Sequence, residues 1–106
     1  MRRVELGGER DVTAPGSVGA LVRRLATEAH TVVIEIGAGG VVGRHPAVVP
    51  QLFVVVRGSG WVSSADGRRE GIAAGEAVLW EQGEEHESGS DVGMTALVVE
   101  AESLAL

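Results

Sequence analysis

Residues Gly39–Gly58, GGVVGRHPAVVPQLFVVVRG, decide the fold class of this chain. The stretch is rich in Val and carries glycine at both ends, and short Val-rich segments between glycines are typical of β-strands. Counted by twos from His45, residues 47, 49, 51, 53 and 55 share one face of the extended chain. The even-numbered residues share the other face. Both faces are apolar, which indicates a strand covered on each side.

The same rhythm runs along the whole chain, in which sixteen Gly and three Pro separate the apolar segments. Asp66-Gly67 is the best turn signal, because Asp-Gly favours the positive φ angles of a two-residue hairpin. Gly37–Gly40 and Gly58–Gly60 indicate two further reversals. Gly19–Glu28 also fits a short helix, but its two arginines suit an edge strand equally well, and we favour the strand. Short strands of this kind predict an all-β sandwich or barrel. The expected strands are Val18–Leu25, His30–Ile36, Val41–His45, Leu52–Arg57, Gly60–Ser64, Arg68–Ile72, Ala77–Trp80, Glu85–Glu87 and Met94–Glu100.

Length and composition exclude several kinds of chemistry. A chain of 106 residues has the size of one domain, which we place at residues 1–106. It contains no Cys, Lys or Tyr, which excludes disulfides, thiolate metal sites, Schiff bases and tyrosine acid/base roles. Three His, nine Arg and fifteen acidic residues remain as the chemical inventory.

Charge and hydropathy indicate the partners and the cellular location of the chain. A net charge of −6 disfavours nucleic acid as a partner, because the phosphate backbone would be repelled. The longest purely apolar run, Leu52–Val56, is far shorter than the roughly 20 residues of a membrane-spanning helix. No signal peptide follows Arg2-Arg3, so we expect a cytoplasmic protein that does not bind membranes. The Lys-free composition, rich in Arg, Gly, Ala and Val, is typical of a GC-rich bacterial genome.

The second apolar face of residues 39–58 needs a cover of its own. A second subunit is the simplest cover, and it predicts a homodimer. The alternative is an N-terminal segment of the same chain.

Two histidines, His45 and His86, each follow a glycine turn at a short fixed distance. The segments around them resemble the two motifs of the cupin family. The first family motif is Gly, five residues, His-x-His, three or four residues, Glu, six residues and Gly, and it aligns without gaps on Gly39, His45, Ala47, Gln51 and Gly58. The second is Gly, five residues, Pro-x-Gly, two residues, His, three residues and Asn, and it aligns on Gly75, Glu81, Gly83, His86 and Ser90. The resemblance implies a double-stranded β-helix, a jelly-roll barrel, over the whole chain.

The resemblance also implies a divalent metal held by three His and one Glu, and two of these four residues are replaced. Ala47 offers only a methyl group, and Gln51 offers a neutral carbonyl oxygen that binds Zn, Fe or Ni more weakly than carboxylate does. The remaining set is His45, Gln51 and His86, with water completing the shell. We therefore expect no tightly bound cofactor, and at most a weakly held Fe, Mn, Ni or Zn.

The predicted site follows from the two motifs. We assign His45 and His86 as acid/base groups, and Glu81 as the carboxylate that orients His86 and raises its pKa. Ala47, Gln51, Phe53 and Trp80 are expected to line an apolar pocket around the two imidazoles. His30 has no partner at a useful spacing and is taken as a packing residue.

Three functions fit this inventory. The first is a cupin that binds a small molecule and moves a proton on it, as in isomerisation, cyclisation or epimerisation, without a tightly bound metal. The second is a metal-dependent, dioxygenase-like cupin that uses His45, Gln51 and His86. The third is a non-catalytic ligand sensor whose dimer is the functional unit, because cupins share a fold far more than an activity.

Overall fold

The structure, a computed structural model, describes residues 1–106 and contains ten β-strands and no helix. Consequently, no helix is present that is long and apolar enough to cross a membrane. The predictions of strands at His30–Ile36, Ala77–Trp80 and Met94–Glu100 are confirmed residue for residue. The strands are β1 (Arg2–Val4), β2 (Arg10–Asp11), β3 (Leu21–Val22), β4 (His30–Ile36), β5 (Gly40–Pro46), β6 (Gln51–Ser63), β7 (Arg69–Ala73), β8 (Ala77–Trp80), β9 (Glu85–Ser90) and β10 (Met94–Glu100).

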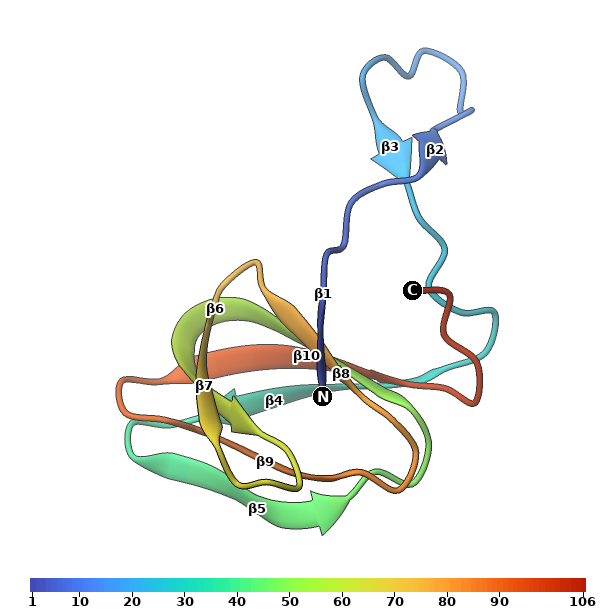
Figure 1. The fold of residues 1–106 in the computed structure, drawn as a ribbon. Helices are drawn as coiled ribbons and strands as arrows, with labels where there is room; N and C mark the ends of the chain where they lie inside the picture. The colour runs from blue at the N-terminus through green and yellow to red at the C-terminus, as the bar shows by residue number, and fades with distance from the viewer.

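The strands form two antiparallel layers that share β6 and close into a barrel (Figure 1). The first half of β6 pairs with β8 and β10, in a layer ordered β1-β8-β6-β10-β4. The second half pairs with β7 and β9, in a layer ordered β5-β9-β6-β7. At one end of the barrel β4, β6 and β9 begin while β5, β8 and β10 end, and we call this end the barrel mouth.

The predicted reversal at Gly58–Gly60 is wrong, because β6 passes from one layer to the other without turning back. Gly58 lies at the corner with φ +76°, and a Cβ there would stand 2.2 Å from the carbonyl oxygen of Gly93. Only glycine fits this close approach in a left-handed conformation. The glycine signal was therefore real, but it marks a bend within one long strand.

The connection predicted at Asp66-Gly67 joins β6 to β7, although its geometry differs from a two-residue hairpin. Only Gly67 has a positive φ, and its N–H donates to the Ser64 carbonyl at 3.0 Å. Asp66 instead accepts from the Arg68 N–H through its side chain at 2.9 Å. The loop is therefore longer than predicted and holds one glycine in the left-handed region.

The strand predicted at Val18–Leu25 is wrong in extent and in position. Only Leu21–Val22 is extended, and it pairs with β2 in a hairpin that stands away from the barrel (Figure 1). Val18, near the tip of this arm, is 94% exposed. The arm lacks a second run of apolar residues to pair with, so its Val and Leu side chains do not enter the core.

Side chains of the two layers fill the barrel interior around Phe53 and Trp80. A second, smaller cluster lies on the outer face of the first layer and is centred on Leu52, Ala77 and Val99. Val4 and Leu25 from the N-terminal part of the chain pack on this outer cluster, as do Leu104 and Leu106 from its C-terminal segment.

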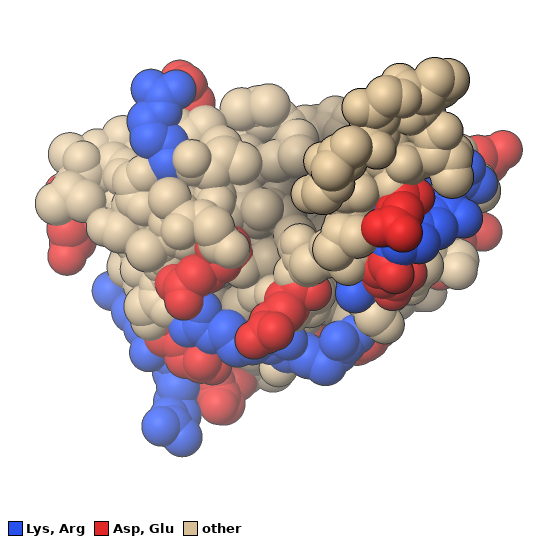
Figure 2. All heavy atoms as spheres, turned by 90° about the horizontal axis from the view of Figure 1, so that it is seen from above, with Lys and Arg blue, Asp and Glu red and all other residues tan.

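The second apolar face is therefore covered in part by the chain itself, as the alternative to a second subunit predicted. Part of the face stays open, because Val33 is 66% and Val56 is 54% exposed. In Figure 2 this side of the molecule shows a broad area without charged side chains, with Arg and acidic residues grouped along its border.

Candidate functional site

The structure brings His45 and His86 into direct contact at the barrel mouth. His45 on β5 lies opposite His86 on β9 in the antiparallel register, and their ring centroids are 4.3 Å apart at an interplanar angle of 57°. The register shifts between Val42 and His45, and such a bulge re-aims the side chains that follow it. The pairing of two motif segments thus places two imidazoles side by side.

Both imidazoles are oriented by main-chain carbonyl groups. The Nδ1 of His45 lies 2.7 Å from the Gly43 oxygen, and the Nδ1 of His86 lies 3.0 Å from the Glu84 oxygen. A carbonyl oxygen only accepts hydrogen bonds, so each Nδ1 carries the proton. In the neutral ring each Nε2 then keeps a lone pair, and neither Nε2 has a hydrogen-bond partner within the chain.

The two rings differ in their exposure to water. His45 is exposed, whereas His86 is only 3% exposed. Burial is the largest cause that lowers the pKa of His86, and positive charge on His45 lowers it further, against the hydrogen bond to Glu84, which raises it. His86 therefore stays neutral at pH 7, with its Nε2 as a base.

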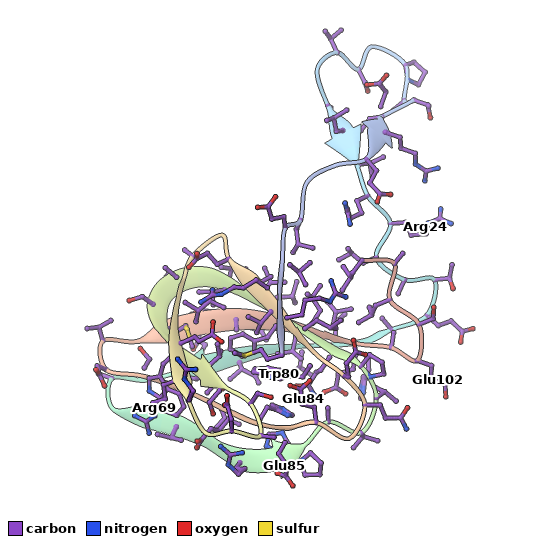
Figure 3. All side chains as sticks on the ribbon, viewed as in Figure 1. Arg24, Arg69, Trp80, Glu84, Glu85 and Glu102 are labelled. Carbon is purple, nitrogen blue, oxygen red and sulfur yellow. The ribbon has the colours of Figure 1, made fainter.

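Trp80 packs directly on the buried histidine. Its indole stacks on the His86 ring at 4.3 Å and 25°, and Phe53 meets the indole edge-on at 5.4 Å. Figure 3 shows Trp80 inside the barrel. Trp80 Nε1 is the one fully covered side-chain nitrogen or oxygen of the chain without a hydrogen-bond partner. An orphan donor of this kind costs about 1–3 kcal/mol, and it is satisfied when a water or ligand acceptor reaches it.

The negative charges that raise the pKa of His86 belong to Glu84 and Glu85, and Glu81 is not among them. The Glu84 side chain binds the amino group of Met1, the Ser64 hydroxyl and the Glu81 N–H, while its main-chain oxygen binds His86. Burial alone would raise the pKa of Glu84, but these hydrogen bonds together outweigh it and lower the pKa. Glu81 is exposed, and its structural link to the site is its N–H bond to Glu84.

The two replaced motif positions lie near the histidines without contacting them through hydrogen bonds. Ala47 is 2% exposed in the core cluster, and its N–H donates to the Glu84 carbonyl at 3.0 Å. Gln51 lies opposite Trp80 in the register of β6 and β8. Its Nε2 donates to Oε1 of Glu100 on β10 at 2.9 Å.

No protein-family model and no curated protein matches the chain, but solved structures do. A protein with a double-stranded β-helix domain from Klebsiella pneumoniae is similar over 91% of this chain and 90% of its own, with a TM-score of 0.66 and 17% identity. An RmlC-like cupin from Shewanella frigidimarina matches 72% of this chain and 68% of its own, with a TM-score of 0.65 and 21% identity. The polyketide cyclase RemF from Streptomyces resistomycificus matches 76% of this chain and 59% of its own, with a TM-score of 0.63 and 25% identity. The chain has a cupin fold.

The cupin fold implies a metal centre at this position, but the residues of this chain do not form the usual ligand set. No group of three or more His, Cys, Asp or Glu side chains is arranged to hold a metal ion. Two imidazoles and the carbonyl oxygen of Gln51 remain, because only the amide nitrogen of Gln51 is bonded to Glu100, and Ala47 has no donor atom. Imidazoles with protonated Nδ1 atoms are nevertheless ready to act through Nε2 toward any electrophile or proton.

Sequence reasoning missed three polar residues of the barrel mouth: Glu84, Glu100 and His30. Glu100 lies opposite both Gln51 and His30 in the register of the first layer. Alternation along Met94–Glu100 places Glu100 on the same face as the buried Ala96 and Val98, and this signal was available in the sequence. The sequence did not show which strands pair with Met94–Glu100, because the register between distant segments depends on the tertiary fold.

The principal surface hollows of the molecule lie away from the histidines. One of about 420 Å³ lies at the base of the arm and includes Arg10 and Arg24, and one of about 610 Å³ surrounds Gly58 and Gly93. Neither includes a residue of the predicted site. Phe53, Trp80 and Ala47 are core residues in the structure, and the apolar pocket predicted around His45 and His86 stays a prediction.

Proposed function

We propose that this cupin binds a small molecule at its barrel mouth and that His45 and His86 move a proton on it, without a tightly held metal. The observation that carries the proposal is the pair of touching imidazoles whose Nδ1 atoms are both held by main-chain carbonyls. A fixed neutral imidazole with a free lone pair is an effective general base near neutral pH.

The proposed step needs no co-reactant. The Nε2 of His86 takes a proton from a carbon next to a carbonyl group, and the electron pair of the broken C–H bond moves onto the carbonyl oxygen as an enolate. The enolate is then protonated at the same carbon from the other side, or it attacks a second carbonyl carbon of the same molecule. The first outcome is an epimerisation or isomerisation, and the second closes a ring and loses water after proton transfer.

The two histidines have complementary surroundings for this step. Burial keeps His86 neutral and ready to accept a proton, and stacking on Trp80 holds its ring in place. His45 is exposed and exchanges protons with water, so it returns the proton to the ligand or removes it from His86. A polyketide cyclase among the structural neighbours supports cyclisation as one member of this reaction class.

The proposal is tested by proton exchange on bound compounds. A metabolite library is screened by thermal shift, and each hit is incubated in D₂O with protein dialysed against EDTA. We expect deuterium to enter a C–H position of a hit, and His86→Gln to slow this exchange by about 100-fold, the usual contribution of a general base. Binding that never leads to exchange would overturn the catalytic part and leave a ligand sensor. Exchange that occurs with undialysed protein but not with protein dialysed against EDTA would support the metal-dependent alternative instead.

We also propose that two copies pair through the part of the outer face that stays open. Val33, Leu97 and Val54 lie opposite one another across β4, β10 and β6, so they form one apolar row. Light scattering after gel filtration is expected to give twice the chain mass, and Val33→Asp to give the mass of one chain. A wild-type monomer at micromolar concentration would contradict this.

A further inference from the structure

At the barrel mouth the first layer carries a polar row of its own. His30 on β4, Glu100 on β10 and Gln51 on β6 are direct neighbours in the register, and Trp80 on β8 continues the row. Glu100 has the same parity as the core residues Ala96 and Val98 and therefore faces the interior. The His45–His86 pair belongs to the other layer and meets this row through Trp80, which stacks on His86.

Glu100 differs from the other partly buried carboxylates of the chain. Three acidic residues are partly buried: Glu84, Glu87 and Glu100. Glu84 contacts the Met1 amino group, and Glu87 lies 3.3 Å from an Arg44 nitrogen. Glu100 takes part in no ion pair within 4.0 Å, and its one side-chain partner is the neutral Gln51 amide. A carboxylate in this position has lost part of its hydration without gaining a cation in return.

Gln51 fixes which oxygen of Glu100 remains available. The amide nitrogen of Gln51 donates to Oε1 at 2.9 Å, which leaves Oε2 without a partner in the chain. Gln51, which stands where the cupin motif has its metal-binding Glu, thus orients the carboxylate of Glu100 on β10.

From this arrangement we infer that Glu100 binds the end of the ligand that carries a positive charge or hydrogen-bond donors. The ligand class is a small molecule with an ammonium or similar cationic group that reaches Oε2 of Glu100. A negatively charged end would be repelled at this position. This inference rests on the proposed binding of a small molecule at the barrel mouth and names the ligand class of that same site.

The test uses three matched probes that share a phenyl ring: benzylamine, benzyl alcohol and benzoate. They are titrated at pH 7 into ¹⁵N-labelled protein while the Gln51 side-chain amide and the Trp80 indole signals are followed. We expect benzylamine to shift both signals, benzyl alcohol to bind more weakly and benzoate to leave them unchanged. We expect Glu100→Gln to weaken benzylamine by about tenfold or more, as for the loss of a hydrogen bond to a charged group.

Glu102→Gln is the matched control, because it removes the same charge from an exposed residue two positions away on the outside of the molecule (Figure 3). It is expected to bind benzylamine as the wild type does. Equal losses in both variants, or benzoate binding as tightly as benzylamine to the wild type, would overturn the inference. The comparison of the probes on the wild type needs no variant, so it decides even if Glu100→Gln does not fold.

Failure of this inference is distinguishable from failure of the proposed function. If His86→Gln abolishes proton exchange on a hit while Glu100→Gln leaves the binding of benzylamine unchanged, the proposed function stands and the role of Glu100 is wrong.

Discussion

The two sides of the barrel mouth carry different functional groups, imidazoles on one side and a carboxylate on the other, and different hydrogen bonds orient them. On the β5–β9 side, two imidazoles are oriented by main-chain carbonyls of Gly43 and Glu84. On the β10–β6 side, one carboxylate is oriented by the side chain of Gln51 alone. The first arrangement withstands replacement of neighbouring side chains, whereas the second depends on a single amide. Trp80 lies opposite Gln51 and is stacked on His86, so it joins the two sides.

Truncation of Trp80 is expected to have the largest effect on stability, because Trp80 packs on His86 on one side of the mouth and lies opposite Gln51 on the other. Trp80→Ala should lower the free energy of unfolding by about 3–5 kcal/mol, the usual cost of truncating a fully buried aromatic side chain. Trp61→Ala is the control, since that indole is only partly buried and packs under Arg69 on the other layer. We expect the control to lose about 1–2 kcal/mol in urea titrations. Equal losses would show that Trp80 has no special place in the mouth.

Restoring the family's ligand set is expected to have the next largest effect. The double variant Ala47→His/Gln51→Glu should bind a divalent metal, because it restores the three imidazoles and one carboxylate that the cupin motifs imply. Zn²⁺ or Mn²⁺ at 100 times its Kd should raise the free energy of unfolding of this variant by about 2.7 kcal/mol. The wild type, with Gln51 turned to Glu100, should show no such rise. The same stabilisation of the wild type by metal would support the metal-dependent alternative.

The pH dependence of stability separates the buried imidazole from the carboxylates. The pKa of His86 lies below its ordinary 6.5 in the folded protein, mainly because the ring is buried. As the pH falls below 6.5, the unfolded chain therefore binds a proton that the folded chain does not, and the free energy of unfolding decreases until the lower folded pKa is passed. The loss contributed by Glu84 begins only below 4.5. Urea titrations between pH 7 and pH 5 should show a decrease that is smaller in His86→Gln, and an equal decrease in the variant would contradict the assignment.

The smallest expected effect distinguishes the two nearby glutamates. Glu84→Gln removes a negative charge that raises the pKa of His86, so the His86 titration should move to lower pH. Glu81→Gln removes an exposed charge, and the His86 titration should keep its wild-type midpoint. Ring-proton shifts followed by NMR decide between them. A shift in Glu81→Gln alone would restore Glu81 as the partner that the sequence predicted.

Local patterns predicted the elements of this fold better than their partners. Alternation and glycine punctuation located β4, β8 and β10, and the spacing of two motifs placed His45 beside His86. The corner at Gly58 was read as a reversal, because a glycine that permits a close approach has the same sequence signal as a glycine in a turn. The hydrogen bond from Gln51 to Glu100 was not predicted, because Glu100 lies 49 residues away along the chain and is brought near by register alone. The arm at residues 7–22 was missed for a related reason, since its apolar residues face water instead of a core.

The tautomeric states of His45 and His86 test the central claim most directly. In ¹H–¹⁵N correlation spectra of the imidazole rings above pH 7, the carbonyl hydrogen bonds predict a proton on Nδ1 and a bare Nε2 in both residues. That result would leave two adjacent lone pairs for a ligand proton at the barrel mouth. A proton on Nε2 of His86, or rapid averaging of its two tautomers, would contradict the account.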